Sequence, residues 1–226
     1  MDIPSKASWN NKSEHHEIKN PAVSNIVSVP LVLTSGETVQ SQIFSFSGVR
    51  DAREHFAIKL GSPDAEAPLV RLHSECITGD VMGSARCDCG PQLNEALRRL
   101  HDHGGFLLYL RQERRGIGLY RKLEACRLQE EGYDTYAANR ALGHDDDDER
   151  DYGAAVDMLN ALGIVRLRLL SNNPDKQAQL VKGGIQVDAL VPTGVFLHQH
   201  NRRYLEAKVK RTSHTIDLSA LQEHTR

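Results

Sequence analysis

The chain has 226 residues, 39% of them hydrophobic and 26% charged, which is typical of a soluble globular protein and sufficient for one domain with a substantial core. Its formal net charge of −2 does not favour nucleic-acid binding, and its longest apolar runs, VPLVL and FLLYL, are far shorter than the roughly 20 residues that span a membrane. Residues 1–20 lack the apolar stretch of a secretory signal, so we expect a cytoplasmic protein whose thiols are reduced.

Three segments of the chain differ in composition. Residues 1–25 are polar, rich in Ser, Asn, Lys, Glu and His, and lack hydrophobic periodicity, which predicts a disordered N-terminal extension. Residues 26–215 hold the periodic segments and predict a single domain. Residues 216–226 predict a polar C-terminal tail.

The periodic segments change in character along the chain. Between Ile26 and Leu72, short apolar or alternating runs are separated by Gly, Pro and Asp, which predicts strands joined by turns. After Gly90, helices and strands alternate. The elements expected there are helix 92–103, strand 106–110, helices 117–132 and 154–163, strand 165–171, helix 174–184, strand 185–191 and a last helix at 201–211. This order predicts an α/β (α+β) fold, a mixed sheet flanked by helices with a β-rich N-terminal portion.

Three of the four cysteines, Cys76, Cys87 and Cys89, lie close together in CITGDVMGSARCDC. Thiolates are soft ligands that suit zinc, and the Gly-rich stretch ITGDVMGS can fold back to bring the first cysteine near the other two. The spacing therefore predicts a three-cysteine zinc site. The alternative is that these cysteines are small buried hydrophobic residues.

The cysteines alone do not decide whether the zinc would be structural or catalytic. Structural zinc has four protein ligands, whereas catalytic zinc usually has three and keeps a position for water. Cys126 could be a fourth ligand, but it lies inside a predicted helix with no second ligand beside it. The polar stretch RLHSE, residues 71–75, directly precedes Cys76 and favours a catalytic site.

Five motifs together resemble those of a known family. RLHSECITGDVMGSARCDCGPQL, followed in order by RQERRGIGL, GYDT, DERD and SNNPDK, is similar to GTP cyclohydrolase II, which opens the imidazole ring of GTP at the start of riboflavin synthesis. The resemblance covers roughly residues 28–215 and is strongest from Arg71 to Lys176.

The resemblance implies a reaction and a set of ligands. Cys76, Cys87 and Cys89 match the family's zinc ligands, with water in the fourth position for attack on C8 of guanine. A second hydrolysis then releases formate. His73 and Glu75, beside the first ligand, would either support that ligand by hydrogen bonds or handle protons. The resemblance also implies Mg²⁺ on the triphosphate and a homodimer, with GTP as small-molecule substrate and neither nucleic acid nor membrane as partner.

The resemblance assigns GTP contacts along the chain. They are Arg71, Leu72, His73, Ser74, Glu75, Gln92, Glu113, Arg114, Arg115, Thr135, Ser171 and Lys176. SNNPDK places Asn173 at a helix N-cap before Pro174, which would direct free N–H groups and Lys176 toward an anion, although a plain helix start needs the same residues. Glu113 suits the N–H donors of guanine; the alternative is a surface ion pair.

The acidic run HDDDDERD, residues 144–151, has two interpretations. One is acidic charge at a helix N-terminus, favoured by the helix dipole. In the family, the DER portion makes Asp148 a proton acceptor and Arg150 the proposed nucleophile at the α-phosphate, with release of pyrophosphate. We assign Arg150 to phosphate binding first, since a protonated guanidinium is a poor nucleophile. Neighbouring carboxylates would help to hold Mg²⁺.

The chain departs from the family pattern at three places. Glu113-Arg114-Arg115 replaces the usual Glu-Gly-Arg, and the acidic run is one residue longer. Cys126 stands where the family commonly has an active-site tyrosine, so a phenolic hydroxyl is lost near the reacting base. In this family, such a replacement is associated with a product that keeps the formyl group. We therefore expect ring opening with impaired release of formate.

A second function remains open on the sequence. If Cys126 completes a closed site of four thiolates, the chain would be a non-catalytic, zinc-stabilised guanine-nucleotide-binding protein. A zinc-knuckle nucleic-acid module fits less well, because aromatic residues do not interleave with the basic ones.

Overall fold

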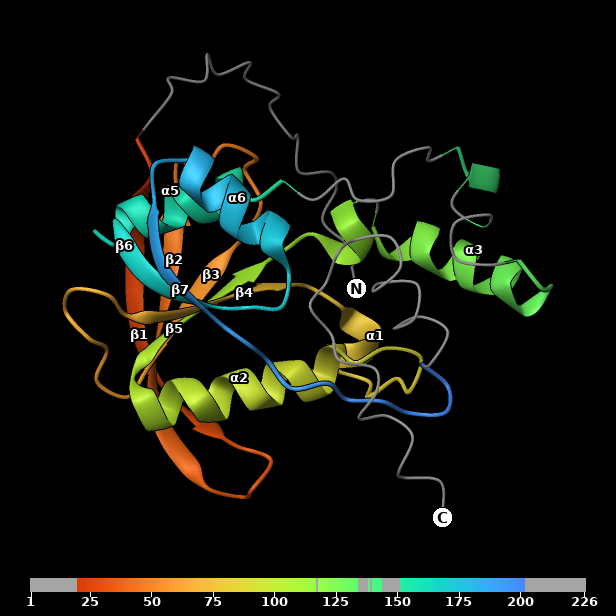
Figure 1. Ribbon diagram of the computed structural model, residues 1–226, viewed down its shortest axis with the longest axis horizontal. Helices are drawn as coiled ribbons and strands as arrows, with labels where there is room; N and C mark the ends of the chain where they lie inside the picture. The colour runs from red at the N-terminus through yellow and green to blue at the C-terminus, as the bar shows by residue number, and fades with distance from the viewer. Residues whose placement is uncertain (1–19, 117, 134–137, 139, 144–150, 202–226) are drawn as a thin grey trace, which may run out of the picture.

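The computed structural model describes residues 20–116, 118–133, 138, 140–143 and 151–201. Within these residues, seven strands form one mixed sheet in the order β1-β2-β3-β5-β4-β6-β7 (Figure 1). The strands are β1 (Ala22–Val32), β2 (Thr38–Ser47), β3 (Phe56–Leu60), β4 (Leu69–Ser74), β5 (Gly105–Leu110), β6 (Arg166–Leu170) and β7 (Gln186–Val191). The predicted mixed sheet with a β-rich N-terminal portion is confirmed.

Helices connect the strands of the second half. The helices described are α1 (Ile77–Asp80), α2 (Cys89–His103), the 3₁₀ turn η1 (Glu113–Gly116), α3 (Leu119–Glu130), α5 (Gly153–Ala161) and α6 (Pro174–Lys182). In Figure 1, α2 lies along one face of the sheet, and α5 and α6 lie on the opposite face. None of the described helices is both long and apolar enough to cross a lipid bilayer.

Strand direction divides the sheet into two parts. β1, β2, β3 and β5 pair antiparallel to their neighbours in that order. β5, β4, β6 and β7 pair in parallel, so their carboxyl ends meet at one edge. The chain leaves β4 for β5 on one side and later reaches β6 on the other side. Open α/β sheets commonly bind ligands at such a reversal of strand order.

Two apolar cores, one on each face, hold the sheet between its helices. Because successive side chains of a strand point to opposite faces, neighbours on one strand enter different cores. Leu107 packs with Ala96 and Leu100 of α2, whereas its neighbour Leu108 packs with α5 and α6. These side chains are fully buried, which fixes the central strands and the edge at which they end.

Two boundaries differ from the prediction. β1 begins at Ala22, so residues 22–25 belong to the sheet and not to a disordered extension. Pairing with β2 explains this difference, since Ala22 and Val23 lie opposite Ser47 and Phe46. The second difference is that α2 begins at Cys89 and not at residue 92, so the last cysteine of CDC occupies the first position of a helix.

Pro91 fits this early start, because the first turn of a helix has no intrahelical use for its N–H groups. The helix expected at 201–211 lies outside the described residues, apart from Asn201.

Candidate metal centre and active site

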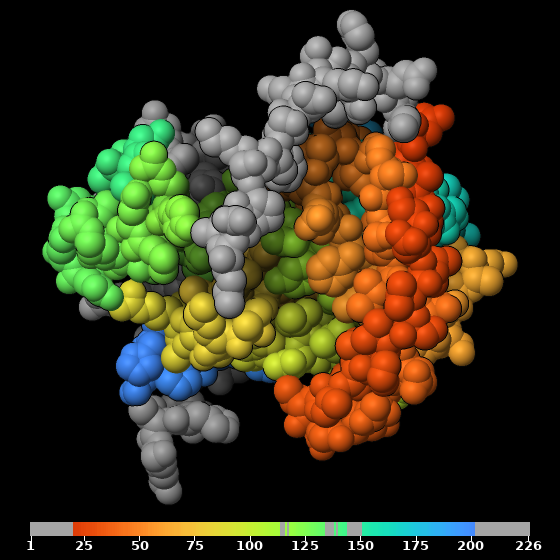
Figure 2. Space-filling model, turned by 180° about the vertical axis from the view of Figure 1, so that it is seen from behind, coloured from red at the N-terminus to blue at the C-terminus, as the bar shows by residue number. Residues whose placement is uncertain are grey.

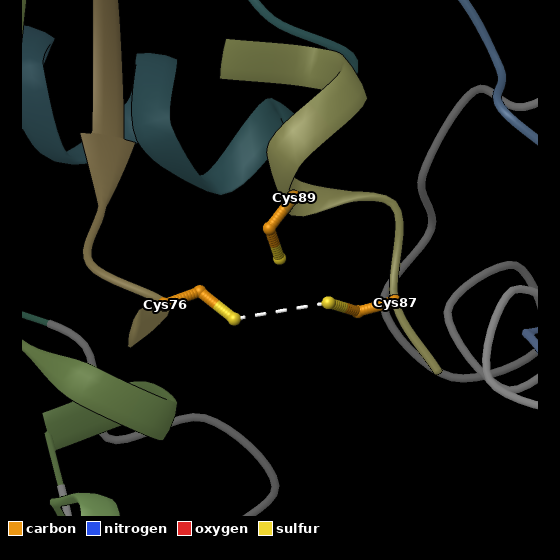
Figure 3. Close-up of side chains that lie close together, drawn as sticks. All are labelled: Cys76, Cys87 and Cys89. Carbon is orange, nitrogen blue, oxygen red and sulfur yellow. Dashed lines mark hydrogen bonds between the residues drawn. The ribbon is translucent and has the colours of Figure 1, made fainter. Parts of the chain in front are cut away.

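The cysteines that sequence spacing singled out converge from three places in the fold (Figure 3). Cys76 follows β4 and precedes α1, Cys87 lies in the loop after α1, and Cys89 opens α2. Among the described residues, these three form a cluster whose sulfur atoms all lie within 4.8 Å of one another. The Sγ atoms of Cys76 and Cys87 are 3.8 Å apart, and all three thiols are free.

Gly79 gives the cluster its space. A Cβ atom at this position would lie 2.7 Å from Cys87 Sγ and 3.1 Å from Cys76 Sγ. At Gly90, a Cβ atom would lie 2.4 Å from the carbonyl oxygen of Gly79. The backbone of α1 therefore packs directly on the sulfur atoms. Three soft donors around one point fit zinc; Cys76 is buried, and Cys87 and Cys89 are partly exposed.

Cys126 lies outside this cluster. It is half-buried on α3, where Arg86 approaches it. Arg86 donates to Glu130 Oε1 at 2.6 Å, and its pKa is raised mainly by that hydrogen bond and also by Cys126. Since Arg86 precedes Cys87, Cys126 lies beside the cysteine loop without joining the ligands. The alternative of a closed site with Cys126 as fourth thiolate is therefore wrong.

Asp80 anchors the first cysteine and was missed by sequence reasoning. Its carboxylate is 2% exposed and accepts from the backbone N–H of Cys76 at 3.0 Å and from the Tyr109 hydroxyl at 2.8 Å. His73 Nε2 also lies 3.0 Å from Asp80 Oδ2. The available signal was the position of Asp80 four residues after Cys76, within hydrogen-bonding reach on one helical turn.

His73 is held in one orientation at the end of β4. Its Nε2 donates to the Asp80 carboxylate, and its ring stacks on Tyr109 at a centroid distance of 5.5 Å. Burial lowers the pKa of His73, while Asp80 opposes the shift. Nδ1 is buried and has no hydrogen-bond partner among the described residues. With Nε2 as the donor, Nδ1 is the acceptor of the neutral ring.

Glu113 connects η1 to the cysteine turn. Its Oε2 accepts from the backbone N–H of Ile77 at 2.7 Å, and its Oε1 accepts from Lys122 Nζ at 2.8 Å. Lys122 Nζ also lies 3.0 Å from Cys76 Sγ. Glu113 therefore forms an ion pair, as the alternative to guanine binding expected, but the residue is only 7% exposed and the pair is not on the surface. Contact with guanine stays a prediction. Sequence reasoning did not find Lys122, because its contact with Cys76, 46 residues earlier, depends on the completed fold.

Burial tends to lower the pKa of Lys122. Its hydrogen bonds with Cys76 and Glu113 outweigh that effect, and the net shift is upward, so the side chain is an ammonium.

Two buried cationic side chains lie behind the ends of β4 and β6. Arg71 donates from Nη1 to the Leu170 carbonyl at 3.0 Å and from Nη2 to Gln92 Oε1 at 2.9 Å. Its Nε has no partner among the described residues, and burial lowers its pKa. Lys176 Nζ donates to the Leu72 carbonyl at 2.7 Å. Four of the predicted GTP contacts are thus brought together, although the Leu72 side chain is fully buried.

The predicted start of α6 is confirmed. Asn173 caps the helix by accepting from the Asp175 N–H at 2.9 Å, with Pro174 in the first turn. Ser171 Oγ accepts from the Asn173 N–H at 3.0 Å. These contacts are those of an ordinary helix N-terminus, so phosphate binding at the N-terminus of α6 stays a prediction.

Ser74 and Glu75, which directly precede Cys76, are held by polar side chains that follow β5. Ser74 Oγ accepts from Gln112 Nε2 at 3.0 Å, and Glu75 pairs with Arg111 at 2.9 Å. Both contacts join β4 to the segment after β5. Sequence reasoning missed Gln112 and Arg111 because the partnership depends on the pairing of β4 with β5.

The remaining predicted site residues cannot be placed in this arrangement. Thr135, Asp148 and Arg150 lie outside the described residues, and the side chains of Arg114 and Arg115 in η1 do too. Their roles stay predictions.

The fold and the site define a class of protein: an α/β protein with a three-cysteine cluster that could hold a metal ion and with buried cationic groups at the carboxyl edge of its parallel strands. Residues 27–192 match the family model of GTP cyclohydrolase II. The chain belongs to this family, as its motifs indicated.

The relatives cover most of the chain. It is 50% identical over 180 residues to GTP cyclohydrolase-2 of Vibrio vulnificus, covering 79% of this chain and 90% of that one. It is 48% identical over 182 residues to GTP cyclohydrolase-2 of Vibrio cholerae, covering 80% and 91%. It is also 47% identical over 178 residues to the riboflavin biosynthesis protein RibBA of Bacillus velezensis, covering 77% of this chain and 44% of the longer protein.

Proposed function

We propose that this protein is a zinc-dependent hydrolase that opens the imidazole ring of GTP at C8 and releases pyrophosphate, with Mg²⁺ bound to the triphosphate. The observation that carries the proposal is the group of three sulfur atoms within 4.8 Å of one another. Relatives named GTP cyclohydrolase-2 match about nine tenths of their own length to this chain and support the choice of substrate.

Cys76, Cys87 and Cys89 would hold the zinc. Since the cluster supplies three ligands, a fourth position is left for a reacting group, as in catalytic zinc sites. When bound, zinc supplies the Lewis acidity that makes water nucleophilic near neutral pH. Asp80 holds the backbone of Cys76 in place by accepting its N–H.

His73 is the best described candidate for proton transfer. Its Nε2 is occupied by Asp80, and its buried Nδ1 can accept a proton from the purine or from water. Glu75 is held by Arg111, which keeps a carboxylate beside the first ligand. Asp148 is the second candidate base.

The phosphates would bind to cationic side chains. Arg71 and Lys176 supply buried positive charge at the carboxyl edge of the sheet, and we assign Arg150 to the α-phosphate. Gln92, bonded to Arg71, and Ser171 would orient the nucleotide from the same edge. Carboxylates of the acidic run would help to hold Mg²⁺.

The product depends on Cys126. A thiol cannot replace the phenolic hydroxyl that the family commonly has at this position, so we expect the formyl group to be retained or released slowly. The default pathway is riboflavin synthesis, since one relative is named a riboflavin biosynthesis protein. A formylated pyrimidine would instead supply a different pathway.

The test is product analysis of the zinc-loaded protein with GTP and Mg²⁺. Mass spectrometry identifies the pyrimidine, and formate and pyrophosphate are assayed in parallel. We expect a formylated diaminopyrimidinone ribosyl phosphate, with pyrophosphate in excess over formate. Cys126→Tyr should raise the formate yield toward that of pyrophosphate, and Cys126→Phe, which adds the ring without the hydroxyl, should not.

Two other outcomes have distinct meanings. Stoichiometric formate from the wild-type protein would refute the role of Cys126 and leave the ring-opening activity intact. Bound but unchanged GTP would instead favour a non-catalytic binding protein. The proposed homodimer and cytoplasmic location are separate predictions, and light scattering after size-exclusion chromatography checks the first.

A further inference from the structure

Lys122 reaches the metal centre from α3. Its Nζ lies 3.0 Å from Cys76 Sγ and 2.8 Å from Glu113 Oε1, so one ammonium contacts a sulfur ligand and a carboxylate together. The Lys122 side chain is 14% exposed and that of Glu113 is 6% exposed. A pair so shielded from water is screened less by salt than a surface ion pair.

Glu113 fixes this ammonium independently of any metal ion. Its second oxygen accepts from the N–H of Ile77, the residue directly after Cys76. The N–H of Cys76 itself is held by Asp80. Charged side chains therefore hold both the backbone and the sulfur of Cys76. Within the described residues, no hydrogen bond from a charged side chain to Cys87 or Cys89 is seen.

We propose that Lys122 is a positioning residue of the metal centre, which donates a charge-assisted hydrogen bond to the Cys76 sulfur. Three thiolates carry more negative charge than a divalent ion neutralises, and uncompensated charge is costly at a site that is partly buried. The ammonium offsets that excess. Its N–H···S bond also withdraws electron density from the sulfur, which leaves the bound metal a stronger Lewis acid. The inference rests on the proposed metal site.

Cobalt(II) is a suitable probe, because its bonds to thiolate give charge-transfer absorption bands. In Lys122→Met, cobalt affinity measured against a competing chromogenic chelator should fall by about 10–100-fold, the usual cost of losing an outer partner of a ligand. The sulfur-to-cobalt band should move to lower energy, since the sulfur lone pair loses its hydrogen bond. Lys122→Arg keeps a cation at this position, so its cobalt affinity and its band energy should lie between those of the wild type and of Lys122→Met.

Arg121→Met is the matched control. Arg121 is the preceding residue on α3, and it is 53% exposed in a surface pair with Glu124. This change also removes a cation from the helix but should alter neither affinity nor band position. Glu113→Gln offers a second variant should Lys122→Met fail to fold. It keeps an oxygen for the Ile77 N–H but weakens the hold on Lys122, so the same band should shift less.

Each result decides the inference. A wild-type band position in Lys122→Met and Glu113→Gln would overturn it, even if affinity fell, because bracing of α3 alone would not change the electronic state of the sulfur. A wild-type protein that binds cobalt without thiolate bands would overturn both this inference and the metal site. Thiolate bands in the wild type with no change in the variants would overturn the role of Lys122 alone.

Discussion

Helix α2 is held to the sheet by apolar packing, whereas α3 reaches the same metal centre through charged side chains. α2 buries Ala96 and Leu100 in the core, and its first residue is a cysteine of the cluster. On α3, Ala125 is the buried residue, while Tyr120 is 83% and Leu123 is 50% exposed. Figure 2 shows α3 (green) beside the cysteine segment (yellow), on the opposite side of the molecule from β1 (red).

This difference separates two tasks at one site. Packing of α2 fixes a ligand in place, because moving it would open cavities in the core. α3 is held by the contacts of Lys122 with Cys76 and Glu113 and by the pair of Arg86 with Glu130. Each of these polar contacts can be tested by a single substitution. Cys126, where the sequence predicts a departure from the family pattern, lies on this second helix.

The largest expected effect is the removal of a ligand from α2. In Cys89→Ser, zinc affinity should fall by more than about 100-fold, since losing even an outer partner of a ligand costs about 10–100-fold. Metal analysis after dialysis should give one zinc per chain in the wild type and none in the variant. Cys126→Ser makes the same chemical change on α3 and should keep its zinc. Equal metal loss in both would show that α3 supplies a ligand.

The next largest effect is on stability, measured by shortening one leucine on α2 and one on α3. Leu100→Ala on α2 deletes a fully buried side chain and should lower the free energy of unfolding by about 2–5 kcal/mol. Leu123→Ala makes the same change at an exposed site of α3 and should change it by no more than about 0.5 kcal/mol. Urea unfolding of the zinc-loaded proteins measures both. Similar losses would mean that α3 is packed as firmly as α2.

The same contrast explains what the sequence could predict. The strands and helices of the sheet follow from periodicity, because Leu107 and Leu108 face different cores in a regular alternation. The three cysteines were predictable because soft ligands at close spacing have few other uses. Neither signal depends on knowing which segments meet.

The outer partners of the cluster were not predictable in this way. Tyr109 and Lys122 act through contacts between separate elements, which leave no periodic pattern. Only Asp80, four residues after Cys76, left a local signal. Even the first strand was placed too late, since residues 22–25 are ordered by pairing with β2 and not by their own composition. Regular packing is encoded locally, whereas the polar shell of a site depends on the completed fold.

The smallest expected effect concerns the outer ion pair of α3. Arg86 and Glu130 are more than half exposed, so Glu130→Gln should lower the free energy of unfolding by no more than about 1 kcal/mol. The pair nevertheless joins the cysteine loop to the helix beside Cys126. Its loss should therefore raise the rate at which a thiol reagent modifies Cys126 in the zinc-loaded protein, where the cluster cysteines are protected.

Glu124→Gln, which breaks the pair with Arg121 on the same helix, is the control and should leave that rate unchanged. Equal rates in the wild type and in Glu130→Gln would mean that apolar contacts of Ala125 hold α3 in place. The distinction between a helix held by apolar packing and one held by ion pairs would then fail at Cys126.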